Sequence, residues 1–256
     1  MKDTTKRRQD GSKGPVIWAG VFIALILLLS VANARLLPEI VELLDKQETD
    51  FKGFVEQVQT AYTEKFLGKK YFININGLYY RTTGRRVLNE IIRLENGMLT
   101  SASMLEQDIG PMADNIGAFS DYLAEEGIPL LYVQPPFKID DEGLLLPPGR
   151  SEFVNRSVDN LLDRLHEMNV CALDLRPYLS ATPELLERNY FKTDHHWNYT
   201  GAFTGFQRIT ETMSELMPDK RLDLSYTNLE RWDSQTLKNW FLGSRGKRVG
   251  QFFGGG

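Results

Sequence analysis

The chain has 256 residues, 42% of them apolar and 25% charged, with a formal net charge of −4. This composition is close to the globular average and excludes a disordered chain, a collagen and a polytopic membrane protein. The net negative charge provides no basic field, so no nucleic-acid partner is expected. A single cysteine, Cys171, excludes an internal disulfide framework and a multi-cysteine zinc module.

An uncharged apolar stretch, residues 15–34, follows a basic amino terminus. Its length of about 20 residues is enough for a helix that crosses the hydrocarbon core of a bilayer. Residues 1–14 carry five cations against two aspartates, which predicts a cytoplasmic tail and a single-pass protein whose domain is extracytoplasmic. The length of the apolar run favours an uncleaved signal-anchor. The alternative is a protein secreted after cleavage near Ala34, because Ala32-Asn33-Ala34 has the small-x-small pattern of a cleavage site.

Residues 35–70 are predicted to form a helical stalk, because apolar residues recur at helical spacing in two runs. The segment that follows, from Tyr71 to Arg81, alternates apolar and polar residues. Its Asn76-Gly77 pair is a two-residue turn signal, so we expect a β-hairpin there. Residues 81–98 are basic and are expected to form loops.

From Asp114 the sequence alternates between helical and strand patterns. Helices are expected at 115–126, at 151–168 with Ser151 as its cap, after the Thr182-Pro183 start signal and after Thr200, and strands at 129–133 and 170–174. This order predicts a parallel sheet covered by helices on both faces. Residues from Arg221 onward, including Trp232 and Trp240, are expected to form β-structure.

Ligands of parallel α/β sheets bind beyond the carboxyl ends of the strands. Residues 134–138, which end at Lys138, and residues 174–176 occupy such positions. Lys138 is therefore a candidate for substrate contact or structural support. Asp140 and Asp141 follow in a charged loop that is expected to be solvated rather than metal-bound.

The segment Asp194-His195-His196-Trp197 is the most unusual cluster of the sequence. In an extended segment Asp194 and His196 share one face and His195 points to the opposite face. A carboxylate beside an imidazole fixes the tautomer of the ring, as a general base for a hydroxyl nucleophile requires, and Trp197 could wall the ring. The alternative to a catalytic pair is an ordinary hydrogen bond at the protein surface. No metal site is expected, because the adjacent histidines diverge and no third histidine or cysteine joins them.

The string Thr193-Asp194-His195-His196-Trp197, followed by Thr200-Gly201-Ala202, resembles the DHHW protein family. That family is similar to the SGNH-like proteins that O-acetylate bacterial exopolysaccharides such as alginate. Segments 132–138, 173–176 and 241–246 fit the same resemblance, which spans residues 71–249.

This resemblance implies an SGNH-hydrolase-like α/β domain in residues 71–256, with a parallel sheet flanked by helices. It implies acyl transfer or ester hydrolysis on a cell-surface glycan, in which Asp194 orients His196 and His196 serves a serine as general base. It implies no cofactor, and as partners the glycan and a membrane protein that supplies the acyl group.

The sequence departs from this family pattern at the nucleophile. Such proteins carry the serine in a Gly-Asp-Ser or Gly-Thr-Ser turn after Asp-x-His, and the nearest candidate here is Ser244 in Gly243-Ser-Arg-Gly246. Ser244 is the weaker candidate because its segment has the pattern of a glycine-rich strand turn. We therefore expect the chain to stop before its nucleophile, with the C-terminal part of the domain missing. The alternative is a non-catalytic anchored protein that binds glycan or an assembly partner.

Overall fold

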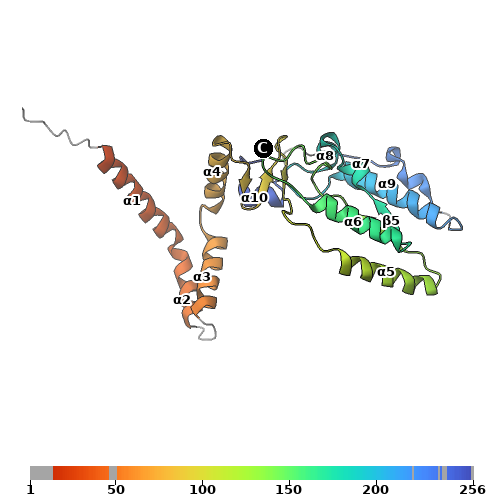
Figure 1. Cartoon of the computed structure of the whole chain (residues 1–256). Coiled ribbons are helices and arrows are strands. Elements are labelled where there is room, and N and C mark those ends of the chain that lie inside the picture. Colours follow the sequence, from red (N-terminus) through yellow and green to blue (C-terminus); the bar gives the residue numbers. More distant parts are fainter. Residues whose placement is uncertain (1–13, 46–50, 221, 236, 238–240, 255–256) are drawn as a thin grey trace, which may run out of the picture. The chain divides into compact units, whose positions relative to one another are not determined.

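The structure is a computed structural model that describes residues 14–45, 51–220, 222–235, 237 and 241–254 (Figure 1). The chain divides into two compact units, Met1–Phe72 and Ile73–Gly256. The described part is of mixed α/β type, as predicted, with ten α-helices and five short strands.

The described residues of the first unit are mainly helical. In chain order they are α1 (Gly14–Asn33), the 3-10 turn η1 (Ala34–Leu36), α2 (Leu37–Asp45), α3 (Phe51–Lys65) and the first turn of α4 (Lys69–Thr82). Among the described residues, one helical stretch, Gly14–Leu43, is long and apolar enough to cross a membrane, with a mean hydropathy of 2.5 and none of that window buried. The helical character predicted for the stalk is confirmed, and α2 and α3 pack against each other.

The β-hairpin predicted from Tyr71 is wrong, because α4 runs as a continuous helix through Asn76 and Gly77. Gly77 is buried, and a Cβ at this position would collide with the carbonyl oxygen of Val249 and crowd Phe253. The glycine therefore permits close packing of α4 against the last described residues of the chain. Burial of this helix face outweighs the local turn preference of the Asn-Gly pair.

Two short strands lie in the region 81–98 that was expected to be loop, and a third follows directly after it. They are β1 (Val87–Leu88), β2 (Ile91–Arg93) and β3 (Leu99–Thr100), paired antiparallel in the order β1-β2-β3. Asn89 and Glu90 adopt positive φ angles of 49° and 64° between the first two strands. These two residues form a tight turn without glycine, which is why the composition did not indicate a hairpin.

The predicted parallel strands are confirmed as β4 (Leu131–Gln134) and β5 (Cys171–Asp174), which pair in parallel register from Leu131–Cys171 to Gln134–Asp174. The helices of this region are α5 (Gly110–Glu125), α6 (Val154–Glu167), α7 (Arg176–Leu179), α8 (Pro183–Asn189) and α9 (Tyr199–Leu216). Figure 1 shows α5, α6 and α9 around this strand pair.

Of the two helix starts predicted from Thr182-Pro183 and Ser151, the first has the expected cap and the second does not. The Thr182 hydroxyl accepts a hydrogen bond from the Leu185 amide at 3.4 Å, and α8 begins at Pro183 as predicted. Ser151 does not cap α6. The Glu152 carboxylate accepts instead, from the Val154 amide at 2.7 Å, because a carboxylate is also a good partner for the free amides of a helix start.

The expected β-structure after Arg221 is wrong for the described residues. This region contains the 3-10 turns η2 (Leu224–Thr227) and η3 (Leu229–Arg231) and the short helix α10 (Ser244–Val249). Arg221 and Trp240 lie outside the described residues. The aromatic residues here suggested strands, but side chains and turns satisfy the local backbone. The indole of Trp232, for example, donates to the Tyr226 carbonyl at 2.9 Å.

Two polar segments near the strand ends have structural roles. Arg176 is buried and pairs with the carboxylates of Asp174 at 2.8 Å and Asp159 at 2.6 Å. Asp140 is 1% exposed and accepts a hydrogen bond from the Leu144 amide at 2.6 Å, so the prediction of a solvated Asp140 is wrong. The Asp140 carboxylate thus holds its own loop together, because a buried carboxylate needs hydrogen-bond donors such as the Leu144 amide.

One core cluster packs against the Asp-His motif through Trp197. It consists of Ile92, Leu94, Met98, Ile139, Leu146, Leu186 and Tyr190, with Trp197 packed against it. A second cluster joins Leu88, Ile91 and Leu99 to Val249 and Phe253. The second cluster fixes α10 to the antiparallel sheet, and this attachment brings Ser244 to the motif.

Candidate active site

Asp194 is a buried carboxylate at the centre of the site, with 2% of its surface exposed. Its Oδ1 accepts from the amide of His196 at 3.0 Å and lies 2.6 Å from the ring Nδ1 of His196. Its Oδ2 accepts from the amide of Ser244 at 2.6 Å. Burial alone would raise the pKa of Asp194, but the hydrogen bonds from Ser244 and His196 outweigh it and hold the pKa well below its usual range.

The predicted contact between Asp194 and His196 is confirmed. Because an ionised carboxylate can only accept hydrogen bonds, Nδ1 of His196 carries the proton in this contact. The second ring nitrogen, Nε2, then keeps a lone pair. This is the tautomer that a general base requires, and the imidazole itself is exposed, at 65% of its side-chain surface.

His195 does not point to the opposite face, so that prediction is wrong. Its Nδ1 lies 3.0 Å from the Ser244 hydroxyl and 3.4 Å from Oδ1 of Asp194, and its ring centroid is 3.7 Å from that of His196. The reason is that the motif forms a turn closed by a bridge between Tyr190 and Trp197. The alternation of side chains along an extended strand does not apply inside such a turn.

Ser244, the weaker candidate in the sequence, lies beside both the carboxylate and the first imidazole. It is the first residue of α10 and not part of a strand turn. Gly243 makes this approach possible, because a Cβ there would collide with the Cβ of Asp194 and the carbonyl oxygen of Thr193. The signal available in the sequence was a Gly-Ser pair after Asp-x-His, without the Asp or Thr that usually separates the two.

Thr193 joins the two segments of the site through its side chain and its backbone. Its hydroxyl accepts from the Gly243 amide at 3.1 Å, and its carbonyl accepts from the Gly246 amide at 2.9 Å. With the bond between Asp194 and Ser244, three contacts hold the start of α10 against the motif. The position of Ser244 is therefore determined by hydrogen bonds that the backbone amides of Gly243, Ser244 and Gly246 donate to Thr193 and Asp194.

Lys138 supports the motif from inside the protein. It is 3% exposed, and its ammonium donates to the carbonyls of Phe191, Lys192 and Asp194 at 2.5, 2.9 and 2.9 Å. Burial lowers the pKa of Lys138 to about 7, with a further lowering by Arg245 that Asp194 partly offsets. Of the two roles expected for Lys138, the geometry favours support, because all three donors are directed at the backbone of the motif.

A cavity of about 230 Å³ opens beside the two imidazoles. It is lined by Pro135, Pro136, Tyr190, His195, His196 and Trp197. The two prolines directly follow the carboxyl end of β4, which is where a ligand was expected. The walls are mainly apolar, so the cavity suits a small apolar group beside the imidazoles.

The prediction that His195 and His196 diverge, on which the absence of a metal ion was expected, is wrong. Asp194, His195 and His196 present ligand atoms that all lie within 4.8 Å of one another, because the two imidazoles do not diverge. Both oxygens of the carboxylate already accept short hydrogen bonds from His196 and Ser244. The arrangement therefore matches an acid-base site, and a divalent cation would have to displace these bonds.

One protein-family model matches the chain. Residues 95–238, more than half of the chain, match the family described as "SGNH hydrolase-like domain, acetyltransferase AlgX". The matched range contains Asp194 and His196 and ends before Ser244. No curated protein matches the chain. The narrower DHHW assignment stays a prediction.

Three of the similar solved structures have low sequence identity to this chain. PatB1 of Bacillus cereus is 25% identical over 52% of this chain and 45% of its own chain, with a TM-score of 0.46. PatB1 with a sulfonyl adduct is 26% identical over 49% and 43%, with a TM-score of 0.44. AlgX of Pseudomonas aeruginosa is 20% identical over 49% and 32%, with a TM-score of 0.37. This chain spans less than half the length of each.

Proposed function

This chain belongs to the family of SGNH hydrolase-like, AlgX-type acetyltransferase domains, and we propose that it transfers or hydrolyses O-acetyl groups on a bacterial cell-surface polysaccharide. The observation that carries the proposal is the convergence of a buried carboxylate, two imidazoles and a serine hydroxyl. The family description supports acetyl transfer as the reaction class. The polysaccharide and the acyl donor are part of the proposal.

The reaction begins with attack of the Ser244 hydroxyl oxygen on the carbonyl carbon of an acetyl ester. The hydroxyl proton passes to an imidazole, a tetrahedral intermediate forms, and the bond to the leaving oxygen breaks as that oxygen takes the proton. The product of this step is acetyl-Ser244. A sugar hydroxyl, or water in hydrolysis, then gives its proton to the same imidazole and attacks the acetyl carbonyl. The bond between the acetyl group and Oγ of Ser244 breaks, and the imidazolium returns the proton to Oγ.

We assign the general base to His196, because the contact of its Nδ1 with Asp194 is 2.6 Å whereas that of His195 is 3.4 Å. The shorter contact to a buried carboxylate stabilises the imidazolium form and fixes the ring. His195 holds the Ser244 hydroxyl in the described arrangement. The alternative, in which His195 takes the proton directly, makes a different prediction for the histidine variants.

We further propose that α1 anchors the protein in the cell membrane and that the second unit acts on the extracytoplasmic side. The length and hydropathy of the Gly14–Leu43 stretch support this placement, and the cations in residues 1–14 support the orientation. A cleaved signal peptide is the alternative. For the anchored protein, we propose that a membrane protein delivers the acetyl groups and that a surface glycan accepts them.

Covalent trapping tests the assignment of the nucleophile. We expect phenylmethylsulfonyl fluoride to form one adduct with the full chain, located on Ser244 by intact mass and peptide mapping. Ser244→Ala should remove the adduct, while Ser234→Ala, which changes an exposed serine of the same unit, should leave it. Absence of an adduct in a folded protein, confirmed by circular dichroism, would overturn the serine mechanism.

A further inference from the structure

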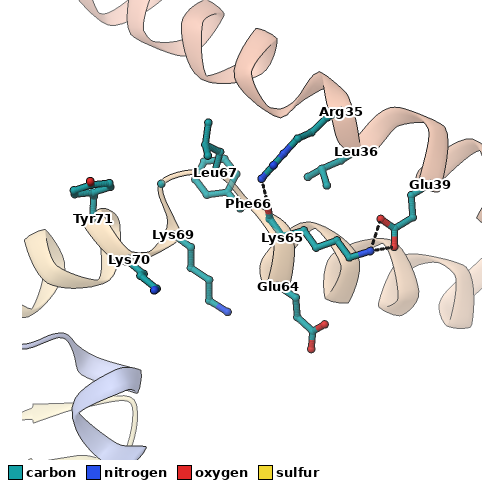
Figure 2. Close-up of a pocket in the computed structure, with 11 residues that line it drawn as sticks. Arg35, Leu36, Glu39, Glu64, Lys65, Phe66, Leu67, Lys69, Lys70 and Tyr71 are labelled. Atoms are coloured by element: carbon teal, nitrogen blue, oxygen red, sulfur yellow. Dashed lines mark hydrogen bonds and ion pairs between the residues drawn. The ribbon is translucent and has the colours of Figure 1, made fainter. Parts of the chain in front are cut away.

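The first unit contains a cavity of about 570 Å³ that plays no part in the candidate active site. Its walls come from η1, α2, the end of α3 and the start of α4 (Figure 2). All of its residues belong to Met1–Phe72.

The cavity lies directly after the apolar helix. Asn33 is the last residue of α1, and its side-chain oxygen accepts from the Leu67 amide at 2.7 Å. Arg35 donates to the carbonyl of Lys65 at 3.1 Å. A helix of 20 residues extends about 30 Å, which equals the hydrocarbon thickness of a bilayer. If α1 spans the membrane, Asn33 and the cavity lie at the level of the lipid headgroups.

The charge of the cavity suits an anion. Four cations line it, Arg35, Lys65, Lys69 and Lys70, against two carboxylates, Glu39 and Glu64. Lys65 pairs with Glu39 at 2.7 Å (Figure 2). In the described part of the chain, neither Lys69 nor Lys70 has an ion-pair partner, and Figure 2 draws no interaction from either ammonium. Two positive charges at this wall are thus available for a ligand.

The same cavity also exposes apolar surface. Leu67 is 49% exposed and Tyr71 is 75% exposed, and both line it beside the two lysines. Figure 2 shows Leu67 and Tyr71 directed away from the paired Lys65 and Glu39. Tyrosine at a membrane surface lies with its ring at the headgroup level. An ion such as free phosphate would use the cations alone, whereas a phospholipid would use the cations and the apolar surface together.

We propose that this cavity binds the phosphate of an anionic phospholipid in the leaflet into which α1 emerges. Lys69 and Lys70 hold the headgroup phosphate, and Leu67 and Tyr71 contact the glycerol and the first carbons of the acyl chains. This inference rests on the membrane anchoring in the proposed function and is independent of the chemistry at Ser244. The bound lipid would fix the α3–α4 turn at the membrane surface.

Native mass spectrometry of the full chain tests the proposal. The protein is released from nanodiscs of phosphatidylcholine with or without phosphatidylglycerol, and the retained lipids are counted. We expect one retained phosphatidylglycerol. Each of Lys69→Ala and Lys70→Ala should weaken its retention about fivefold, since one basic side chain near an anionic surface contributes about that factor. The matched control is Lys52→Ala, an exposed lysine of α3 that does not line the cavity.

Three results would overturn the site. The first is equal lipid retention by the unmodified chain and a variant that combines Lys69→Ala with Lys70→Ala, and the second is an equal loss of retention in Lys52→Ala. The third is displacement of the lipid by inorganic phosphate at the same concentration. Carbonate extraction and sulfonyl labelling of Ser244 are measured on the same samples. If the unmodified chain resists carbonate extraction and is labelled at Ser244 but retains no phosphatidylglycerol, only the lipid site is contradicted. Full extraction by carbonate contradicts the anchor and the lipid site together.

Discussion

The backbone amide of Ser244 donates to Oδ2 of Asp194 at 2.6 Å across 50 positions of the chain. The other oxygen of the same carboxylate accepts from the ring of His196. One buried carboxylate thus positions both the proposed base and the residue that carries the proposed nucleophile. The contact makes Ser244, a minor feature of the sequence, part of the site.

The histidine variants should separate the two bases. His196→Ala is expected to lower the rate of p-nitrophenyl acetate hydrolysis about 10²- to 10⁴-fold, the usual contribution of a positioned base. His195→Ala should cost less, because its contact with Asp194 is longer. The matched control is His166→Ala, the exposed histidine of α6, which should retain full activity. A larger loss in His195→Ala than in His196→Ala would assign the base to His195.

Stability should decrease in acid because of Asp194. Its pKa in the folded state lies below the ordinary value, which is about 3.9 in unfolded chains. The carboxylate therefore contributes stability at pH values above about 4, and this stability is lost as the pH falls toward the lower, folded-state pKa. Asp194→Asn should flatten the acid limb of the urea midpoint measured between pH 7 and 3. Asp121→Asn, on the exposed face of α5, should leave the limb unchanged.

Lys138→Met should disorder the motif, because three carbonyls lose their common donor. We expect lower thermal stability and a reduced rate of adduct formation at Ser244, while Lys220→Met, at an exposed position, should change neither. Normal adduct formation in folded Lys138→Met protein would contradict the supporting role.

The pH dependence of stability gives a second measure of Lys138. Burial lowers the pKa of Lys138 to about 7, whereas a lysine in an unfolded chain has a pKa of about 10.4. Between these values the unfolded state binds more protons, so stability should rise with pH from about 7 toward 10. The difference in unfolding free energy between the unmodified chain and Lys138→Met, from urea denaturation at pH 7, 8 and 9, should grow over this range. A constant difference would contradict a lowered pKa.

Gly243→Ala should separate Ser244 from Asp194. The added Cβ would collide with Asp194 and Thr193, so the start of α10 must shift. We expect a folded second unit with little or no sulfonyl adduct on Ser244, measured by intact mass. Gly205→Ala is the matched control, because a Cβ there meets Trp197 only at an ordinary 3.5 Å. Full adduct formation in Gly243→Ala would show that this close approach is not needed.

Divalent cations should inhibit rather than activate. Because the oxygens of Asp194 are engaged by His196 and Ser244, we expect EDTA to leave ester hydrolysis unchanged. Excess Zn²⁺ should inhibit by taking imidazole nitrogens, and His195→Ala should weaken that inhibition. Loss of activity with EDTA and recovery with one equivalent of Zn²⁺ would instead indicate a metal-dependent site.

Much of the fold follows from local signals in the sequence. The apolar helix α1, the parallel pair β4 and β5, and the start of α8 at Pro183 correspond to patterns that are complete within short segments. The helix α4 was not predictable in this way, because the burial of Gly77 against Val249 and Phe253 outweighs the turn preference of Asn76-Gly77. A contact between residues so distant in the chain leaves no local periodicity to detect.

The sequence by itself determined the pairing of Asp194 with His196, because two positions in one short segment suffice to bring a carboxylate to an imidazole. Only the tertiary structure decided the places of His195 and Ser244. The turn closed by Tyr190 and Trp197 brings His195 to the same side as His196. Packing of α10 on the antiparallel sheet carries Ser244 to the carboxylate. Both depend on long-range burial and hydrogen bonds, for which a single sequence shows the partners but not their proximity.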